Sequence, residues 1–169
     1  MFKIGSNVIY KREVCKIKAI RKNSFTNLDC YVLESLSDPT LTINVPVDNK
    51  NGFISNLLTK KEAEELIDNI SSIEVIDVDN KNVEIEYKNL LHSKKHTDLI
   101  KIIKTAYLRN QKRKENKRNI SQKDDEYFEK AEKYLYNELS IVLGLSYDDT
   151  KNYVIKKVVE KGDKFEQNS

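Results

Sequence analysis

The sequence has little of what loop-rich enzyme scaffolds and membrane proteins are made of. It contains 4 Gly, 2 Pro and no Trp among its 169 residues. No stretch approaches the roughly 20 apolar residues that a membrane-spanning helix needs. Residues 1–5 also lack the apolar core of a signal peptide. We therefore expect a cytoplasmic protein that does not interact with membranes.

Cysteine is scarce too. Cys15 and Cys30 are the two cysteines of a Lys-rich chain. Because disulfides are rare in cytoplasmic proteins, we expect both thiols to be reduced and half-buried.

Sequence patterns of catalysis and of metal binding are missing as well. There is no Gly-rich phosphate loop and no nucleophile elbow. His92 and His96 stand four residues apart, which can place two imidazoles on one helical face, but two ligands do not close a metal site. The acidic residues between positions 62 and 86 fall on expected solvent faces or turns. We expect no enzyme activity, no metal, no cofactor and no small-molecule substrate.

What the sequence does have is charge, and the charge is sorted along the chain. Charged residues make up 34% of the chain and hydrophobic residues 38%, with a net charge of +3. Residues 87–123 hold 12 Lys or Arg against 2 acids, whereas residues 59–86 carry a net charge of −6 and residues 124–169 one of −4. Such sorting predicts one surface that binds a polyanion.

The first 50 residues alternate apolar and polar side chains in short runs, which is the pattern of β-strands. Strands are predicted at residues 8–10, 15–19, 30–33 and 41–45. Four or five short strands predict a small, strongly bent sheet or barrel of the SH3 or Tudor type. The fold class is thus predicted to be α+β, with a Tudor/SH3-like β-barrel at residues 1–58.

An all-α domain is predicted over residues 59–161. Thr59 and Glu62 form a capping box ahead of a first helix. Hydrophobic spacing over residues 99–107 predicts another helix with one apolar face.

Further along the chain, Ser121 and Ser146 suit the starts of two more helices, and Gly144 suits the stop between them. Residues 71–86 are ambiguous, because they fit either a β-hairpin or an acidic linker. Residues 162–169 are predicted to be a frayed tail.

We call residues 87–123 the basic segment. Its cations are densest past the last apolar position of the helix expected around residues 99–107. Basic residues there can simply complement the helix dipole and solvate a loop. A run this dense, with more lysines before it, favours contact with phosphates, which gives affinity without sequence specificity. The run comprises Arg109, Lys112, Arg113, Lys114, Lys117 and Arg118, preceded by Lys88, Lys94, Lys95, Lys101 and Lys104.

Residues 2–5 and 8–10 read Phe-Lys-Ile-Gly and Val-Ile-Tyr, and they look like the start of the CarD/CdnL-type family of bacterial transcription regulators. Residues 41–49 (Leu-Thr-Ile-Asn-Val-Pro-Val-Asp-Asn) resemble the end of their RNA-polymerase-interacting domain, which transcription-repair coupling factors share. The likeness continues through residues 87–109 and the closing helices.

The resemblance implies a Tudor-like domain that docks on the β subunit of RNA polymerase and a helical domain that touches upstream promoter DNA. The protein would then be cytoplasmic and associated with the nucleoid through RNA polymerase. The strand that docks by β-augmentation would consist of Leu41, Thr42, Ile43, Asn44 and Val45. The DNA backbone would be contacted, weakly and without sequence specificity, by Tyr87, Lys88, Lys94, Lys95, Arg109, Lys112 and Arg113.

The sequence also departs from this family. Lys11 and Arg12 stand where the family has a small-residue turn, and Asn44 replaces a basic residue of the polymerase-facing strand. No Trp precedes Tyr87 to act as an aromatic wedge in the DNA. The resemblance therefore supports polymerase docking better than stabilisation of the transcription bubble.

Two other classes of function stay open. A protein–protein adaptor would place the basic segment against an acidic surface of polymerase or of another partner and never touch DNA. An RNA-binding Tudor or SH3-like module would need exposed aromatic platforms for the bases, which this sequence lacks.

Overall fold

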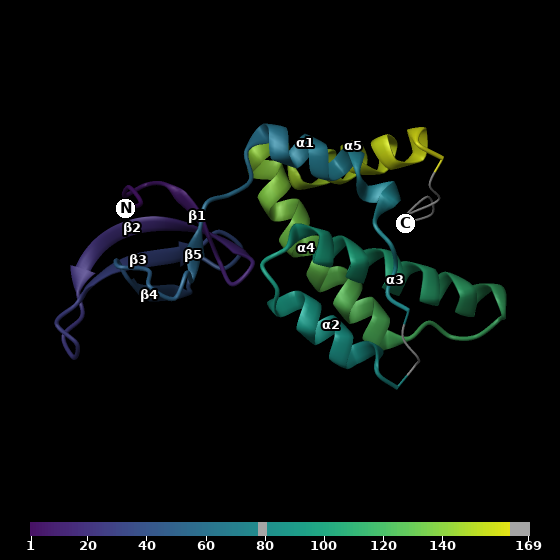
Figure 1. Cartoon of the computed structure of the whole chain (residues 1–169), viewed down its shortest axis with the longest axis horizontal. Helices are drawn as coiled ribbons and strands as arrows, with labels where there is room; N and C mark the ends of the chain where they lie inside the picture. The colour runs from purple at the N-terminus through teal and green to yellow at the C-terminus, as the bar shows by residue number, and fades with distance from the viewer. Residues whose placement is uncertain (78–80, 163–169) are drawn as a thin grey trace. The chain divides into compact units, whose positions relative to one another are not determined.

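Sheet and helices occupy separate parts of the chain in the computed structural model, which describes residues 1–77 and 81–162 (Figure 1). One unit spans Met1–Leu57 and the other spans Leu58–Ser169. Apart from Gly162, the predicted frayed tail lies outside the described residues. The fold class is α+β.

The N-terminal unit is a five-stranded antiparallel sheet. Its core is made by alternate side chains of neighbouring strands, among them Ile17, Tyr31 and Leu33, which are fully buried on one face. The spatial order of the strands is β4-β3-β2-β1-β5. The strands are β1 (Asn7–Tyr10), β2 (Glu13–Lys22), β3 (Asp29–Ser35), β4 (Thr42–Pro46) and β5 (Ile54–Ser55).

The predicted Tudor/SH3-like barrel is wrong, because this sheet is open. Closure requires the two outermost strands to pair with each other, and here β4 and β5 remain the two edges. β5 has only two residues, and the side-chain amide of Asn49 binds its edge. The Ile54 N–H donates to Asn49 Oδ1 (3.1 Å), and the Ile54 C=O accepts from Asn49 Nδ2 (2.9 Å). Asn49 is thus bound to the Ile54 N–H and C=O, the backbone groups that β5 would need in order to pair with β4.

Cys15 and Cys30 are free thiols, and both are more deeply buried than predicted. Burial and, secondarily, the charge of Glu13 raise the pKa of the Cys15 thiol to about 11.

Since the thiolate is the reactive form, we expect Cys15 of the folded protein to resist alkylation by iodoacetamide at pH 8. Mass spectrometry of quenched time points checks this. Modification should follow unfolding, and rapid modification of native protein would contradict the prediction.

The second unit is helical. Within residues 58–77 and 81–162 it forms α1 (Lys60–Asp68), the 3₁₀ turn η1 (Ile70–Ser72), α2 (Val83–His92), α3 (His96–Glu115), α4 (Gln122–Leu143) and α5 (Tyr147–Glu160).

The predicted helix caps are confirmed. Thr59 and Glu62 form a complete capping box at the start of α1. Ser121 and Ser146 each accept a hydrogen bond from the backbone N–H three residues further on. Gly144 ends α4 in the left-handed conformation, with φ of 68°.

The core of the helical unit lies mainly between α3 and α4, which pack along each other (Figure 1). Ile102 and Ile103 of the predicted apolar stripe are fully buried, as is Leu139 of α4. Among the described residues, no helix combines the length and the apolar character that crossing a membrane requires.

The ambiguous segment does not form the hairpin. Residues 83–86 belong to α2, where Val83 and Tyr87 lie one turn apart and are both buried. Ahead of the helix, Ile76 donates its backbone N–H to Thr105 Oγ1 (2.9 Å) and so ties this stretch to α3. Residues 78–80, at the expected hairpin turn, lie outside the described residues.

Candidate functional site

The predicted polymerase-binding strand is an edge of the sheet. β4 pairs with β3. Leu41 O accepts the N–H of the last residue of β3 (3.4 Å), and Val47 N–H donates to the first residue of β3 (2.9 Å). Because bonds to the neighbour alternate along an antiparallel strand, the N–H and C=O of Thr42 and Asn44 point away from β3. These four backbone groups form an open edge.

The five predicted docking residues divide into two sets. Val45 is buried at 3% exposure and Ile43 packs against the same core, whereas Leu41 lies just outside β4. Thr42 and Asn44 have exposed side chains on the other face. Sequence reasoning identified the strand, but Thr42 and Asn44 are the residues that can pair with an added strand.

A hollow of about 340 Å³ adjoins this edge. Its lining includes Thr42 and Asn44, together with Arg21, Lys22 and Phe25 from the end of β2 and the following loop. Phe25 is 97% exposed. Side chains of a strand added at β4 would lie beside this hollow, and its two cations favour acidic ones.

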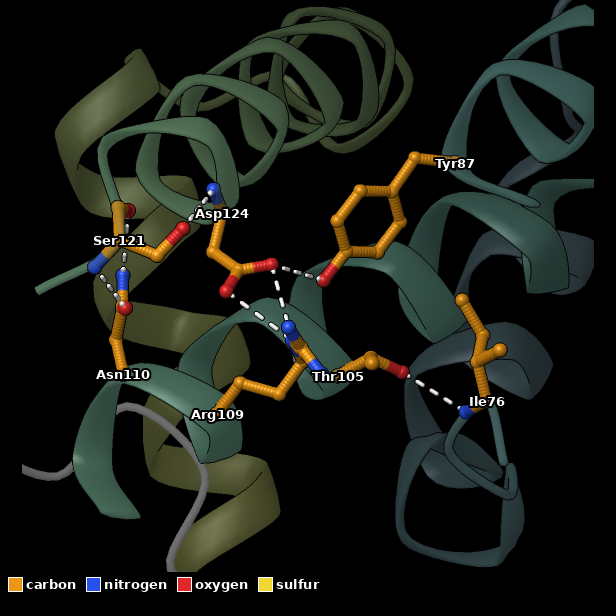
Figure 2. A network of polar contacts seen from close by, with 7 residues as sticks. All are labelled: Ile76, Tyr87, Thr105, Arg109, Asn110, Ser121 and Asp124. Atoms are coloured by element: carbon orange, nitrogen blue, oxygen red, sulfur yellow. Dashed lines mark hydrogen bonds and ion pairs between the residues drawn. The ribbon is translucent and has the colours of Figure 1, made fainter. Parts of the chain in front are cut away.

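Two predicted DNA contacts, Tyr87 and Arg109, take part in a polar network that joins three helices (Figure 2). The Tyr87 hydroxyl donates to Asp124 Oδ1 (2.8 Å). Arg109 Nε donates to both carboxylate oxygens of Asp124 (3.2 and 3.1 Å). Asp124, three residues after the Ser121 cap, is fully buried. One carboxylate therefore ties α2 and α3 to the start of α4.

Burial removes Tyr87 from any surface that DNA could reach, because its side chain is fully enclosed. Desolvation and then the bond to Asp124 raise the pKa of the phenol well above its ordinary value. The Arg109 side chain is 20% exposed and ion-paired to Asp124. Both residues stabilise the helical unit: the Tyr87 hydroxyl and the Arg109 Nε–H are bound to Asp124.

Lys104 of the basic segment is also structural. It is 7% exposed, and its Nζ donates to the backbone oxygens of Ile70 (3.0 Å) and Ile73 (2.7 Å). These backbone acceptors take the place of the water that the Lys104 side chain loses on burial. Lys104 fixes η1 and its exit against α3.

The remaining predicted DNA contacts lie on the surface but not in one cluster. Lys88 is on α2 and pairs with Glu84 (3.4 Å). Lys94 and Lys95 are exposed immediately before α3, whereas Lys112 and Arg113 lie in its last turn. At about 1.5 Å per residue, the 20 residues of α3 separate its two basic ends by ~30 Å.

The densest group of cations caps the C-terminal end of α3. We call this group the basic turn; it consists of Lys112, Arg113, Lys114, Lys117 and Arg118. Lys117 N–H donates to Lys114 O (3.0 Å) and Arg118 N–H donates to Arg113 O (2.8 Å). Lys117 has the left-handed φ of 55°, so this is the two-bond cap that commonly ends α-helices. The cations are held at the negative end of the helix dipole, which favours their charge.

Lys117 occupies a backbone conformation that suits Gly better than Lys. We expect Lys117→Gly to raise the free energy of unfolding of the helical unit by about 1 kcal/mol. Lys117→Ala is the control, because it removes the charge and keeps the strained φ. Urea denaturation of both variants should show a gain for Gly alone. Equal changes in the two variants would mean that the charge, and not the backbone, sets the effect.

The two histidines have separate partners. His92 Nδ1 lies 2.6 Å from Lys88 O, and His96 Nε2 lies 2.6 Å from Glu138 Oε2. Glu138 Oε1 also accepts the N–H of Leu58 (2.9 Å). Across residues 1–77 and 81–162, no three His, Cys, Asp or Glu side chains are grouped so that they could hold a metal ion.

Comparison with known proteins adds no relative from which an activity could be transferred: no protein-family model and no curated protein matches this chain.

Proposed function

We propose that this chain is a CarD/CdnL-type transcription regulator that docks on the β subunit of RNA polymerase through the open edge of β4. The observation that carries the proposal is the pair of residues Thr42 and Asn44, whose backbone groups point away from β3. The opposite edge is bound by Asn49. Natural sheets usually protect exposed edges against unwanted pairing, so one protected and one open edge suits a protein that adds a specific strand.

The helical unit would contact promoter DNA through phosphates. Lys94 and Lys95 at one end of α3 and the basic turn at the other would supply the cations. Their separation of ~30 Å is close to one turn of duplex DNA, roughly 34 Å. Such contacts are weak and indifferent to sequence. Docking on polymerase would make them effective by raising the local concentration of DNA.

One rival proposal is a protein–protein adaptor on RNA polymerase or another acidic partner, without DNA contact. Ile120 favours it: this residue is 45% exposed and closely follows the basic turn. Exposed apolar groups beside cations also suit an acidic protein surface.

Titration of the full chain against core RNA polymerase, and against a purified fragment of its β subunit, tests the docking. We expect saturable binding in the micromolar range to both. If the chain binds neither core RNA polymerase nor the β fragment, the proposal is overturned.

Crosslinking of the bound chain to promoter DNA inside the polymerase complex separates regulator from adaptor. We expect crosslinks that disappear when Lys112 and Arg113 are both replaced by Glu, while polymerase binding persists. No crosslink in the unmodified complex would favour the adaptor.

A further inference from the structure

We propose that Asn110, a neutral residue, positions the basic turn for binding to the phosphates of duplex DNA. This inference rests on the DNA contact proposed above. Asn110 stands on α3, two residues before the basic turn begins, and its side chain reaches across to Ser121, the N-cap of α4 (Figure 2).

The side-chain amide of Asn110 binds the backbone of a single residue, Ser121, at two points. Asn110 Oδ1 accepts the Ser121 N–H (2.8 Å), and Asn110 Nδ2 donates to Ser121 O (3.3 Å). The Ser121 hydroxyl in turn accepts the Asp124 N–H (3.2 Å). One amide therefore fixes the end of the connection between α3 and α4 in both position and direction.

The beginning of the same connection is fixed by the helix cap, through the bond from Arg118 N–H to Arg113 O. Only residues 119 and 120 lie between this bond and Ser121. Asn110 thus fixes the far end of an exposed connection that carries two of the five cations. The neighbouring Arg109 holds the same first turn of α4 through Asp124.

It matters that this connection is fixed before DNA binds. A mobile connection would have to be ordered on binding, and the loss of its conformational freedom would weaken the affinity. In a loosened connection, Lys117 and Arg118 keep their charges but must be ordered on the DNA. A substitution that removes a cation should therefore change the salt dependence of binding. A substitution that only loosens the connection should lower the affinity and leave the salt dependence unchanged.

The experiment compares variants of the full chain that bind a short random-sequence duplex, by fluorescence anisotropy over a series of salt concentrations. Asn110→Ala is expected to lower the affinity about tenfold at every salt concentration, with an unchanged slope of log K against log salt. Lys112→Gln is expected to reduce the magnitude of that slope by about 0.9. Asn119→Ala is the matched control, because Asn119 is exposed in the same connection; it should change neither quantity.

Backbone ¹H–¹⁵N heteronuclear NOE values of residues 116–120 give a second readout on free, folded protein. They should fall in Asn110→Ala and stay unchanged in Asn119→Ala. If Asn110→Ala remains folded and binds DNA as tightly as the unmodified chain, the inference is overturned while the DNA contact stands. If Lys112→Gln leaves the salt slope unchanged, and Arg113→Gln does too, the DNA contact through the basic turn fails and this inference fails with it.

Discussion

Replacement of Asp124 by Ala is expected to lower the free energy of unfolding of the helical unit by about 3–5 kcal/mol. The Asp124 carboxylate is fully buried and accepts hydrogen bonds from Tyr87 and from Arg109. Its removal leaves the Tyr87 hydroxyl and the mostly enclosed Arg109 guanidinium without this partner. An unpaired polar or charged group in the interior costs far more than the net contribution of the intact contact.

Asp125→Ala is the matched control for this experiment. Asp125 is the next residue in the first turn of α4, so both variants lose a carboxylate that interacts favourably with the helix dipole. That shared effect amounts to less than about 1 kcal/mol. Urea denaturation of the two variants, followed by far-UV circular dichroism, should show a much larger loss for Asp124→Ala. Similar losses would contradict the assignment of Asp124 as the link between three helices.

Under the docking proposed above, replacement of Asn44 by Pro is expected to weaken binding to the β subunit of RNA polymerase at least about 100-fold, because the open edge loses a backbone donor at its centre. The Asn44 N–H points away from β3, so its loss leaves the ladder between β3 and β4 intact. A strand added at this edge would lose a hydrogen bond and meet the proline ring. These two penalties together amount to about 3 kcal/mol, which corresponds to about 100-fold in affinity.

Asn44→Ala is the control for this prediction, since it retains the N–H and removes the side chain. Calorimetric titration of the β fragment should show near-normal affinity for Asn44→Ala. Thermal unfolding should show that both variants remain folded. A folded Asn44→Pro variant that binds normally would contradict strand addition at β4. Equal weakening in both variants would mean that the side chain, and not the backbone, carries the contact.

The helix caps, which depend on neighbouring residues, were predictable from the sequence. The caps at Thr59, Ser121 and Ser146 each rest on a contact three residues away. α2 was missed because its start alternates apolar and acidic residues like a strand. The helical spacing of Val83, Tyr87 and Leu90 was the signal that could have identified it.

Features that depend on distant residues were not predictable. The open sheet follows from the short β5 and from the contact of Asn49 with Ile54, and no local pattern reports such a contact. One local feature also escaped prediction: Lys11 and Arg12 form a two-residue hairpin turn with positive φ, a conformation that neither residue favours.

The same division between local patterns and contacts with distant residues holds for the candidate site. Charge sorting located the basic segment, but it could not separate exposed cations from structural ones. The partner of Arg109 is 15 residues away in the chain, and the partner of Tyr87 is 37 residues away. Likewise, the alternation of apolar and polar residues predicted the strand at β4. Which of its residues form the open edge depends on how β4 pairs with β3.

The most direct test of strand addition at β4 is amide hydrogen exchange of the full chain, followed residue by residue by NMR, with and without the β fragment of RNA polymerase. In the free protein, the amides of Thr42 and Asn44 should exchange rapidly and that of Ile43 slowly. Binding should protect Thr42 and Asn44 strongly, because their N–H groups would pair with the added strand. If the complex forms and these two amides still exchange at their free rates, docking through the open edge of β4 is contradicted.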